Sequence, residues 1–176
     1  MQFHPTKLSD VYLVQPEPAR DDRGFFARTF CAEEFARHGL ETSFPQHSIS
    51  FSLRRGTLRG MHYQRDPHGE VKLVRCARGA ILDIIIDIRP ASPTYRRWQA
   101  FELSGADGHQ LYIPKGFAHG FQTLSDDVEV SYLISAPYRP EFADGIRYDD
   151  PAFGINWPLP VSEISEKDRR WSDFSE

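Results

Sequence analysis

Titratable side chains recur inside segments that otherwise have the composition of β-strands. His62 lies in the run 58–64, Lys72 begins the next such run, and Tyr132 lies in the run 128–134. A strand that only builds a core excludes such groups, because an unpaired polar group is costly to bury. Imidazole and phenol have reference pKa values of about 6.5 and about 10, which suit a general base and a proton donor, and an ammonium group stabilises an oxyanion. The three residue types together predict a proton-transfer site.

Strand alternation decides whether these side chains can meet. Each of His62, Lys72 and Tyr132 is in phase with mostly apolar neighbours on its own strand. If those faces line the interior of one barrel, the three side chains converge in one cavity. Any one of them alone is better explained as a core residue with a satisfied hydrogen bond, but three in compatible phase favour function.

Arg59 is out of phase with His62, so strict alternation places the two on opposite faces. Gly60 lies between them and is a residue at which a β-bulge could re-aim one side chain. Alternatively, Arg59 pairs with an acidic residue on the outer face. Both interpretations remain open at the level of the sequence.

Most of the chain is expected to form short strands separated by turn markers such as the runs 22–24, 65–69 and 89–93. The expected strands are 11–14, 25–30, 48–52, 57–63, 71–76, 80–88, 98–103, 110–113, 119–124 and 129–135. A helix is expected over 32–38, and a helical turn is expected from Ser165. This pattern predicts an all-β fold, a jelly-roll (cupin-like) barrel with a few short helices. After residue 135, repeated prolines break up the chain, so this tail is expected to wrap the barrel.

The composition indicates one globular domain that spans residues 1–176, with 40% hydrophobic and 26% charged residues. The net charge is −4 and the two signs are interspersed, so we expect no nucleic-acid partner. The sequence contains no apolar window of membrane-spanning length and no signal-peptide pattern, so we expect no membrane association and a cytoplasmic location. Cys31 and Cys76 lie in apolar runs and are expected to be free thiols.

The run 114–119 has the form PxGxxH, which resembles the second motif of the cupin superfamily. In metal-binding cupins the histidine of this motif joins an HxH pair, and the corresponding run here is His62-Tyr63-Gln64. The second histidine is missing, so the usual ligand set is incomplete and we expect no metal. His119 is then expected to bind substrate or to hold a loop.

A longer set of motifs occurs in one order along nearly the whole chain. They are DRGFF at 22–26, GTLRGMHYQ at 56–64, KLV at 72–74, IPKGFAHGF at 113–121 and SEKD at 165–168. This set resembles the dTDP-4-dehydrorhamnose 3,5-epimerase family. The resemblance implies a jelly-roll barrel, a homodimer, and catalysis without a metal or an organic cofactor. It implies a nucleotide-diphosphate sugar as substrate, namely a 4-keto-6-deoxyhexose.

The resemblance also implies roles for individual residues. His62 is implied as the base, Asp168 as the carboxylate that orients it, and Tyr132 as the acid on the opposite face of the sugar. Lys72 is implied to face the 4-keto oxygen, with help from His119 or its neighbours. The implied substrate contacts are Arg23, Arg59 and Lys167 at the diphosphate or sugar, Gln46 and Ser48 in a substrate-binding segment, and Tyr138 stacked on the base.

Some positions depart from the family pattern. Arg28 stands where many members have a glutamate, and Ser48 stands where they have an asparagine. These departures leave open whether the nucleotide is dTDP or CDP, and whether C3, C5 or both are inverted. The alternatives are a single-centre epimerase of another deoxysugar, a metal-dependent cupin oxygenase, and a non-catalytic sugar-binding barrel.

Overall fold

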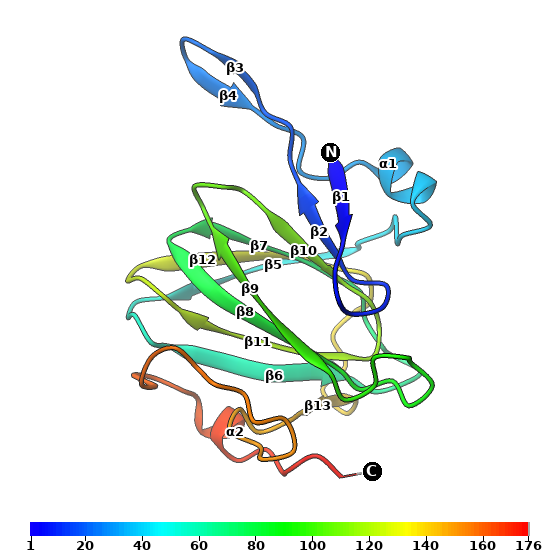
Figure 1. Cartoon of the computed structure of the whole chain (residues 1–176), viewed down its shortest axis with the longest axis vertical. Helices are drawn as coiled ribbons and strands as arrows, with labels where there is room; N and C mark the ends of the chain where they lie inside the picture. Colours follow the sequence, from blue (N-terminus) through cyan, green and yellow to red (C-terminus); the bar gives the residue numbers. More distant parts are fainter. Residues whose placement is uncertain (176) are drawn as a thin grey trace.

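Two antiparallel sheets lie face to face in the computed structural model, which describes residues 1–175 (Figure 1). The six-stranded sheet has the order β1 (Gln2–Pro5), β2 (Tyr12–Gln15), β10 (Gln110–Ile113), β7 (Lys72–Arg78), β12 (Val128–Ile134) and β5 (Gln46–Ser52). The five-stranded sheet has the order β13 (Ala143–Gly145), β6 (Leu58–Gln64), β11 (Phe117–Thr123), β8 (Ala80–Asp87) and β9 (Trp98–Ser104). A hairpin of β3 (Ala19–Asp21) and β4 (Gly24–Phe26) and two short helices, α1 (Ala32–Arg37) and α2 (Glu166–Arg169), complete the fold of the described residues. The prediction of an all-β jelly-roll barrel with a few short helices is confirmed.

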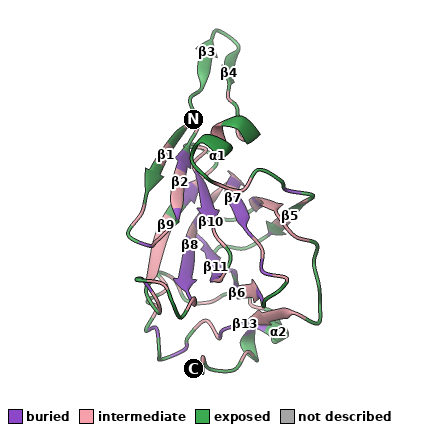
Figure 2. Ribbon diagram, turned by 90° about the vertical axis from the view of Figure 1, so that its right-hand side faces the viewer, coloured by how far each residue is buried: buried purple, intermediate pink, exposed green. Residues whose placement is uncertain are grey.

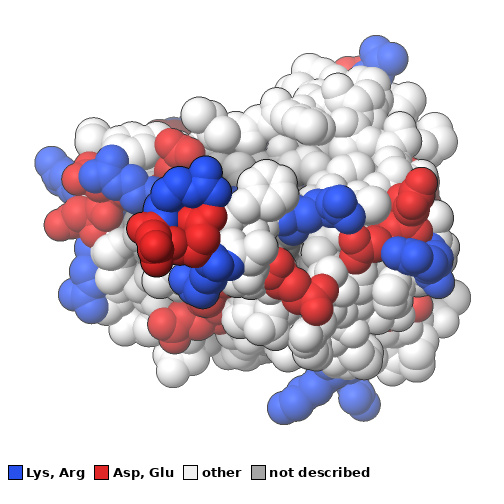
Figure 3. Space-filling model, turned by 90° about the horizontal axis from the view of Figure 1, so that it is seen from above, with Lys and Arg blue, Asp and Glu red and all other residues white. Residues whose placement is uncertain are grey.

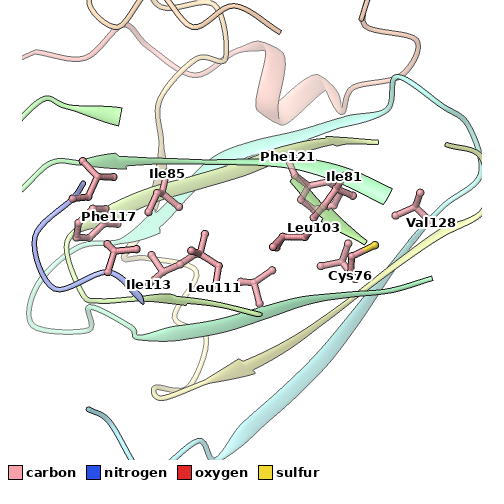
Figure 4. Close-up of a cluster of buried hydrophobic side chains, with 13 residues drawn as sticks. Cys76, Ile81, Ile85, Leu103, Leu111, Ile113, Phe117, Phe121 and Val128 are labelled. Atoms are coloured by element: carbon pink, nitrogen blue, oxygen red, sulfur yellow. The ribbon is translucent and has the colours of Figure 1, made fainter. Parts of the chain in front are cut away.

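The main core lies between the two sheets, because alternate residues of each strand point inward. Figure 4 shows this cluster, in which Cys76, Leu111, Ile113 and Val128 come from the region of the six-stranded sheet and Ile81, Ile85, Leu103, Phe117 and Phe121 from the other. In Figure 2 the buried residues concentrate in the central strands β7, β8, β10 and β11. Burial of one such side chain stabilises the folded state by about 1.5–3 kcal/mol, so this cluster gives the two sheets a stable relative position.

The chain after residue 135 covers the outer face of the five-stranded sheet, as expected for a tail that wraps the barrel. A second buried cluster joins Ile84 and Ile86 of β8 to Ile146 and Phe153 of the tail. Ile84 and Ile86 alternate with the inward-facing Ile85, so β8 is buried on both faces. The tail thereby brings α2 beside β6.

Some elements differ from the expectation. Strands β1, β3 (Ala19–Asp21), β4 (Gly24–Phe26) and β13 are only three or four residues long, too short for a readable alternation. The expected strand over 25–30 ends at Phe26. Phe30 instead packs against Phe35 of α1 and against Phe44, so its apolar side chain belongs to a second core region.

The thiols of Cys31 and Cys76 are both free, as expected. No helix within residues 1–175 has the length and hydropathy that crossing a membrane requires. On the face seen in Figure 3, acidic and basic side chains lie beside one another, and no continuous basic area covers that face.

Candidate active site

One cavity of about 700 Å³ opens between the strands and the C-terminal tail. Its walls come from β5, β6, β7, β11 and β12, and α2 closes one side. Every candidate site residue of the sequence analysis except Arg23 lines it, namely Gln46, Ser48, Arg59, His62, Lys72, His119, Tyr132, Tyr138, Lys167 and Asp168. The fold therefore gathers residues that lie more than a hundred positions apart into one chemical site.

His62 and Asp168 form a close pair in this cavity. The Nε2 atom of His62 lies 2.7 Å from Oδ1 of Asp168, whose Oδ2 accepts the Gly60 amide at 3.3 Å. Burial alone would raise the pKa of Asp168, but its bonds to His62, Gly60 and Ser165 outweigh burial and lower it. The carboxylate is thus ionised and can only accept, so the proton of the neutral imidazole lies on Nε2. The Nδ1 atom of His62 remains as the basic atom of the pair.

A β-bulge at Gly60 places Arg59 and His62 at the same cavity. His62 pairs with His119 and Arg59 pairs with Phe121. Between these two pairs β6 advances by three residues and β11 by only two, so β6 contains one extra residue. Gly60 has a φ of +147°, and a Cβ there would lie 2.5 Å from Gly120 Cα, so only glycine fits. Of the two interpretations of Arg59, the bulge is confirmed. The Arg59 guanidinium donates to Ser52 Oγ at 3.1 Å and to the Phe51 carbonyl at 2.9 Å.

Tyr132 brings a half-buried phenol to the cavity wall from β12. Its hydroxyl lies 3.0 Å from Ser50 Oγ, and its ring meets the ring of His119 edge to face at 6.4 Å. Burial raises the pKa of Tyr132, and its hydrogen bond with Ser50 only partly offsets this. The phenol is therefore protonated at neutral pH and has a proton to donate.

His119 is held by a carboxylate of its own. Its Nε2 atom is hydrogen-bonded to Oδ2 of Asp83 at 3.1 Å, and Asp83 is fully buried on β8. The geometry repeats that of His62 and Asp168, but His119 is almost fully buried whereas the His62 side chain is 42% exposed. The difference makes His62 the more accessible of the two imidazoles to a substrate.

Lys72 supplies a cation at the cavity from β7. Its Nζ atom lies 3.0 Å from Oε1 of Glu70, and the second oxygen of Glu70 accepts from Gln64 at 3.0 Å. The Nζ atom also lies 3.4 Å from the His62 carbonyl, so Lys72 sits close to the base. An ammonium group in this place can stabilise negative charge that develops on a bound ketone.

Arg23 does not join the cavity of its own chain. It lies at the turn of the β3–β4 hairpin, which extends away from the barrel in Figure 1. Its side chain is 90% exposed and pairs only with Asp21 among the interactions of the described residues. The sequence motif that contains Arg23 cannot reveal this distance, because it reports the type of a residue and not its place in the fold.

Three polar side chains that bond the candidate residues His119, Lys72 and Tyr132 were not predicted. Asp83 holds His119, Glu70 holds Lys72, and Ser50 bonds Tyr132. Asp83 had a readable signal, since an aspartate inside the apolar run 81–86 needs a buried partner. Glu70 has no such signal, because nothing in the sequence shows that its side chain meets that of Lys72, two residues away. Ser50 has none, because only the pairing of β5 with β12 brings it to Tyr132.

Metal-ligating residue types are dispersed rather than clustered. Among residues 1–175 the structure contains no group of three or more histidine, cysteine, aspartate or glutamate side chains placed to hold an ion. The two cavity histidines are each bonded to a carboxylate instead.

Comparisons with known proteins give the family of this chain. The family model described as dTDP-4-dehydrorhamnose 3,5-epimerase matches residues 5–176. The chain is 44% identical to an enzyme of that name from Methanothermobacter thermautotrophicus over 99% of this chain and 95% of the relative. It is 34% identical to a dTDP-4-dehydrorhamnose 3-epimerase from Streptomyces niveus over 96% of this chain and 82% of the relative.

The fold is also similar to that of a solved relative. The crystal structure of dTDP-4-dehydrorhamnose 3,5-epimerase from Bacillus anthracis, with TDP and pyrophosphate bound, superposes with a TM-score of 0.95. The two chains are 36% identical, and the match covers 98% of this chain and 99% of the other. This chain therefore belongs to the dTDP-4-dehydrorhamnose 3,5-epimerase family of isomerases.

Proposed function

We propose that this enzyme inverts C3 and C5 of a dTDP-linked 4-keto-6-deoxyhexose, the 3,5-epimerase step of dTDP-L-rhamnose synthesis. The observation that supports it most is that one cavity contains both the His62–Asp168 pair and the Tyr132 phenol. A base and an acid at one site are what an epimerase needs, because each inverted carbon loses a proton on one face and gains one on the other.

The chemistry assigns a part to each group. The 4-keto group acidifies the hydrogens on C3 and C5, so His62 Nδ1 removes one of them and the electron pair moves onto the C4 oxygen. Lys72 stabilises that oxygen, and Asp168 stabilises the imidazolium that forms. Tyr132 then delivers a proton to the opposite face of the same carbon, and the C4 ketone is restored. Protons are exchanged and no electrons are lost, so the reaction calls for no redox cofactor.

The part of the cavity that Tyr138 lines suits the nucleotide. Tyr138 is 53% exposed and offers a ring for a base to stack on, and its backbone amide donates to Gln46 Oε1 at 3.1 Å. Arg59 and Lys167 bring two cations to the cavity for the diphosphate. Ser48, on β5 like Gln46, offers a hydroxyl to the substrate.

We further propose that the enzyme is a homodimer. β5 is an edge strand, and Ile49 on it and Leu53 directly after it are 69% and 70% exposed. Phe25 and Phe26 of the β3–β4 hairpin are 66% and 78% exposed, on an arm that extends from the barrel (Figure 1). Such apolar surface favours burial against a second copy. In that arrangement Arg23 would contact substrate in the partner's cavity. Sedimentation equilibrium that gives the monomer mass at micromolar concentration would overturn this part.

The cell compartment follows from the thiols. Free Cys31 and Cys76 are typical of a reducing environment, so we place the enzyme in the cytoplasm.

The proposed ligands are limited to the nucleotide sugar, with no nucleic acid or membrane partner. The comparisons give no support to the oxygenase alternative.

A second candidate is a 3-epimerase, which the 34% identical relative from Streptomyces niveus favours. An assay distinguishes the 3,5-epimerase from the 3-epimerase. The purified enzyme is incubated with dTDP-4-keto-6-deoxyglucose and a reductase that traps the product. NMR of the trapped sugar should show inversion at both carbons. Inversion at C3 alone would establish the second candidate, and no inversion with either the dTDP- or the CDP-linked sugar would overturn the proposed function.

A further inference from the structure

Helix α2 carries the carboxylate that bonds the candidate base, yet the helix has only four residues. Isolated helices shorter than about 12 residues are marginal in water, so contacts with the rest of the chain must fix the place of Asp168. On the N-terminal side of α2, the Leu58 amide of β6 donates to the Glu163 carbonyl at 2.8 Å. This bond ties down only one end of the segment.

Trp171 ties down the other end, two residues after α2. Its indole packs directly on the α-carbon of Gly145 in β13. A Cβ built on Gly145 would lie 2.7 Å from Cδ2 of the indole and closer still to Cε2 and Nε1. Gly145 is the residue that pairs with His62 across β13 and β6. The indole thus rests on the strand that lies directly beside the base.

The indole, and not the backbone, requires a glycine at this position. The φ angle of Gly145 lies outside the left-handed region, so an alanine there would have an ordinary backbone conformation. The side chain of an alanine, however, has no space unless the indole moves. Gly145 and Trp171 are therefore matched in shape.

Packing, and not hydrogen bonding, holds Trp171 in place. Its Nε1 atom is buried and has no hydrogen-bond partner among the described residues. The Lys167 ammonium lies 5.1 Å from the centre of the indole, so the ring also contacts the cation that α2 brings to the cavity. The contact between Trp171 and Gly145 thus holds the C-terminal end of α2, the helix that carries both Lys167 and Asp168.

We propose that Trp171, packed on Gly145, is a positioning residue for the epimerase reaction: it holds α2 so that Asp168 meets His62 Nε2. The proposal rests on the proposed function, because it assigns Trp171 a part in the action of the base. Displacement of a catalytic group by about 1 Å can cost about 10²-fold in rate, so loss of this contact is expected to lower kcat strongly.

The test compares Trp171→Ala, Gly145→Ala and the double variant with Trp171→Phe. Trp171→Ala frees α2, and Gly145→Ala displaces the indole, so each should lower kcat about 10–100-fold. In the double variant the added methyl group meets no indole, so Gly145→Ala should have no further effect there. Trp171→Phe keeps an aromatic ring on Gly145 and should recover most of the activity. Affinity for dTDP, measured by calorimetry, should fall less than kcat in Trp171→Ala, because Lys167 shares the diphosphate with Arg59 whereas Asp168 alone among the described residues bonds the imidazole of the base.

The pH dependence of kcat separates positioning from general loss of structure. In Trp171→Ala the acid limb of the profile should move in the same direction as in Asp168→Asn, because both weaken the same pair. Trp157→Ala is the matched control, since Trp157 lies in the same tail, outside the cavity, with its indole N–H bonded to the Tyr148 carbonyl at 2.8 Å. It should lower the melting temperature and leave kcat and the pH profile unchanged.

Two results would overturn the proposal while leaving the proposed function intact. The first is that the wild type is active and that Trp171→Ala keeps the kcat and the pH profile of the wild type. The second is a Trp171→Phe variant as impaired as Trp171→Ala, because the indole N–H would then be needed for a bond to the substrate. A wild type that inverts neither carbon would overturn both.

Discussion

Asp168 Oδ1 lies 2.7 Å from His62 Nε2 although the two residues are 106 positions apart in the chain. The tail of the protein returns to the barrel to make this one contact at the cavity. The pair defines which imidazole atom is basic, because an ionised carboxylate can only accept the Nε2 proton. Much of the proposed catalysis depends on this relationship.

Asp168→Asn is expected to lower kcat about 10²–10⁴-fold with little change in fold. The amide keeps the size of the carboxylate but can donate to Nε2, which would move the imidazole proton to Nδ1 and block the base. Steady-state kinetics with the trapped product measure this. Asp173→Asn is a control in the same tail, since its carboxylate pairs with Arg147 outside the cavity. Equal rates for both variants would remove Asp168 from the mechanism.

Tyr132→Phe is expected to retain proton removal but to lower product formation about 10²-fold, because the ring remains and the acid is lost. NMR in heavy water reports the two steps separately, as exchange of the substrate hydrogens and as product. Since burial raises the pKa of Tyr132, its phenol should cause no basic limb in the wild-type pH–rate profile below about pH 10. Unchanged product yield in Tyr132→Phe, with Tyr148→Phe as control, would argue against this role.

Lys72→Met is expected to lower kcat about 10²–10³-fold, because the charge on the C4 oxygen loses its cation. The single variant also leaves Glu70, whose side chain is 11% exposed, without its cationic partner and should reduce stability. Adding Glu70→Gln should restore the melting temperature but not the activity. Lys115→Met, at an exposed position, is the control for loss of a positive charge. Recovery of activity in the double variant would show that Lys72 acts only through Glu70.

Asp87→Asn tests a structural carboxylate away from the cavity. Burial would raise the pKa of Asp87, but bonds from Arg89, Ser92 and Thr94 lower it, so folding favours the ionised form. Its contribution, about 1.5–3 kcal/mol in the free energy of unfolding, is fully present above the unfolded pKa of about 3.9 and is lost as pH falls through the lower folded value. Urea unfolding should show a constant deficit for the variant from pH 7 to about 5, which shrinks below about pH 4. A deficit that does not change down to pH 3 would contradict this.

Most of the strands and three of the cavity residues could be predicted because each has a local signal, whereas the other predicted cavity residues rest on the resemblance to the family. His62, Lys72 and Tyr132 stand out as polar residues within strands, and the alternation of their neighbours gives the face. The bulge at Gly60 could be proposed but not decided, since its presence depends on the register with β11. The partners Glu70 and Ser50 and the contact of Trp171 with Gly145 could not be predicted, because only the packed tertiary structure brings them together.

The most direct test of the account is hydrogen exchange in heavy water on the dTDP-linked 4-keto sugar, with the wild type and His62→Ala compared by NMR. The wild type should introduce deuterium at C3 and at C5, and His62→Ala should introduce none at either carbon while it still binds dTDP. Deuterium uptake by His62→Ala at the wild-type rate would contradict the assignment of the base.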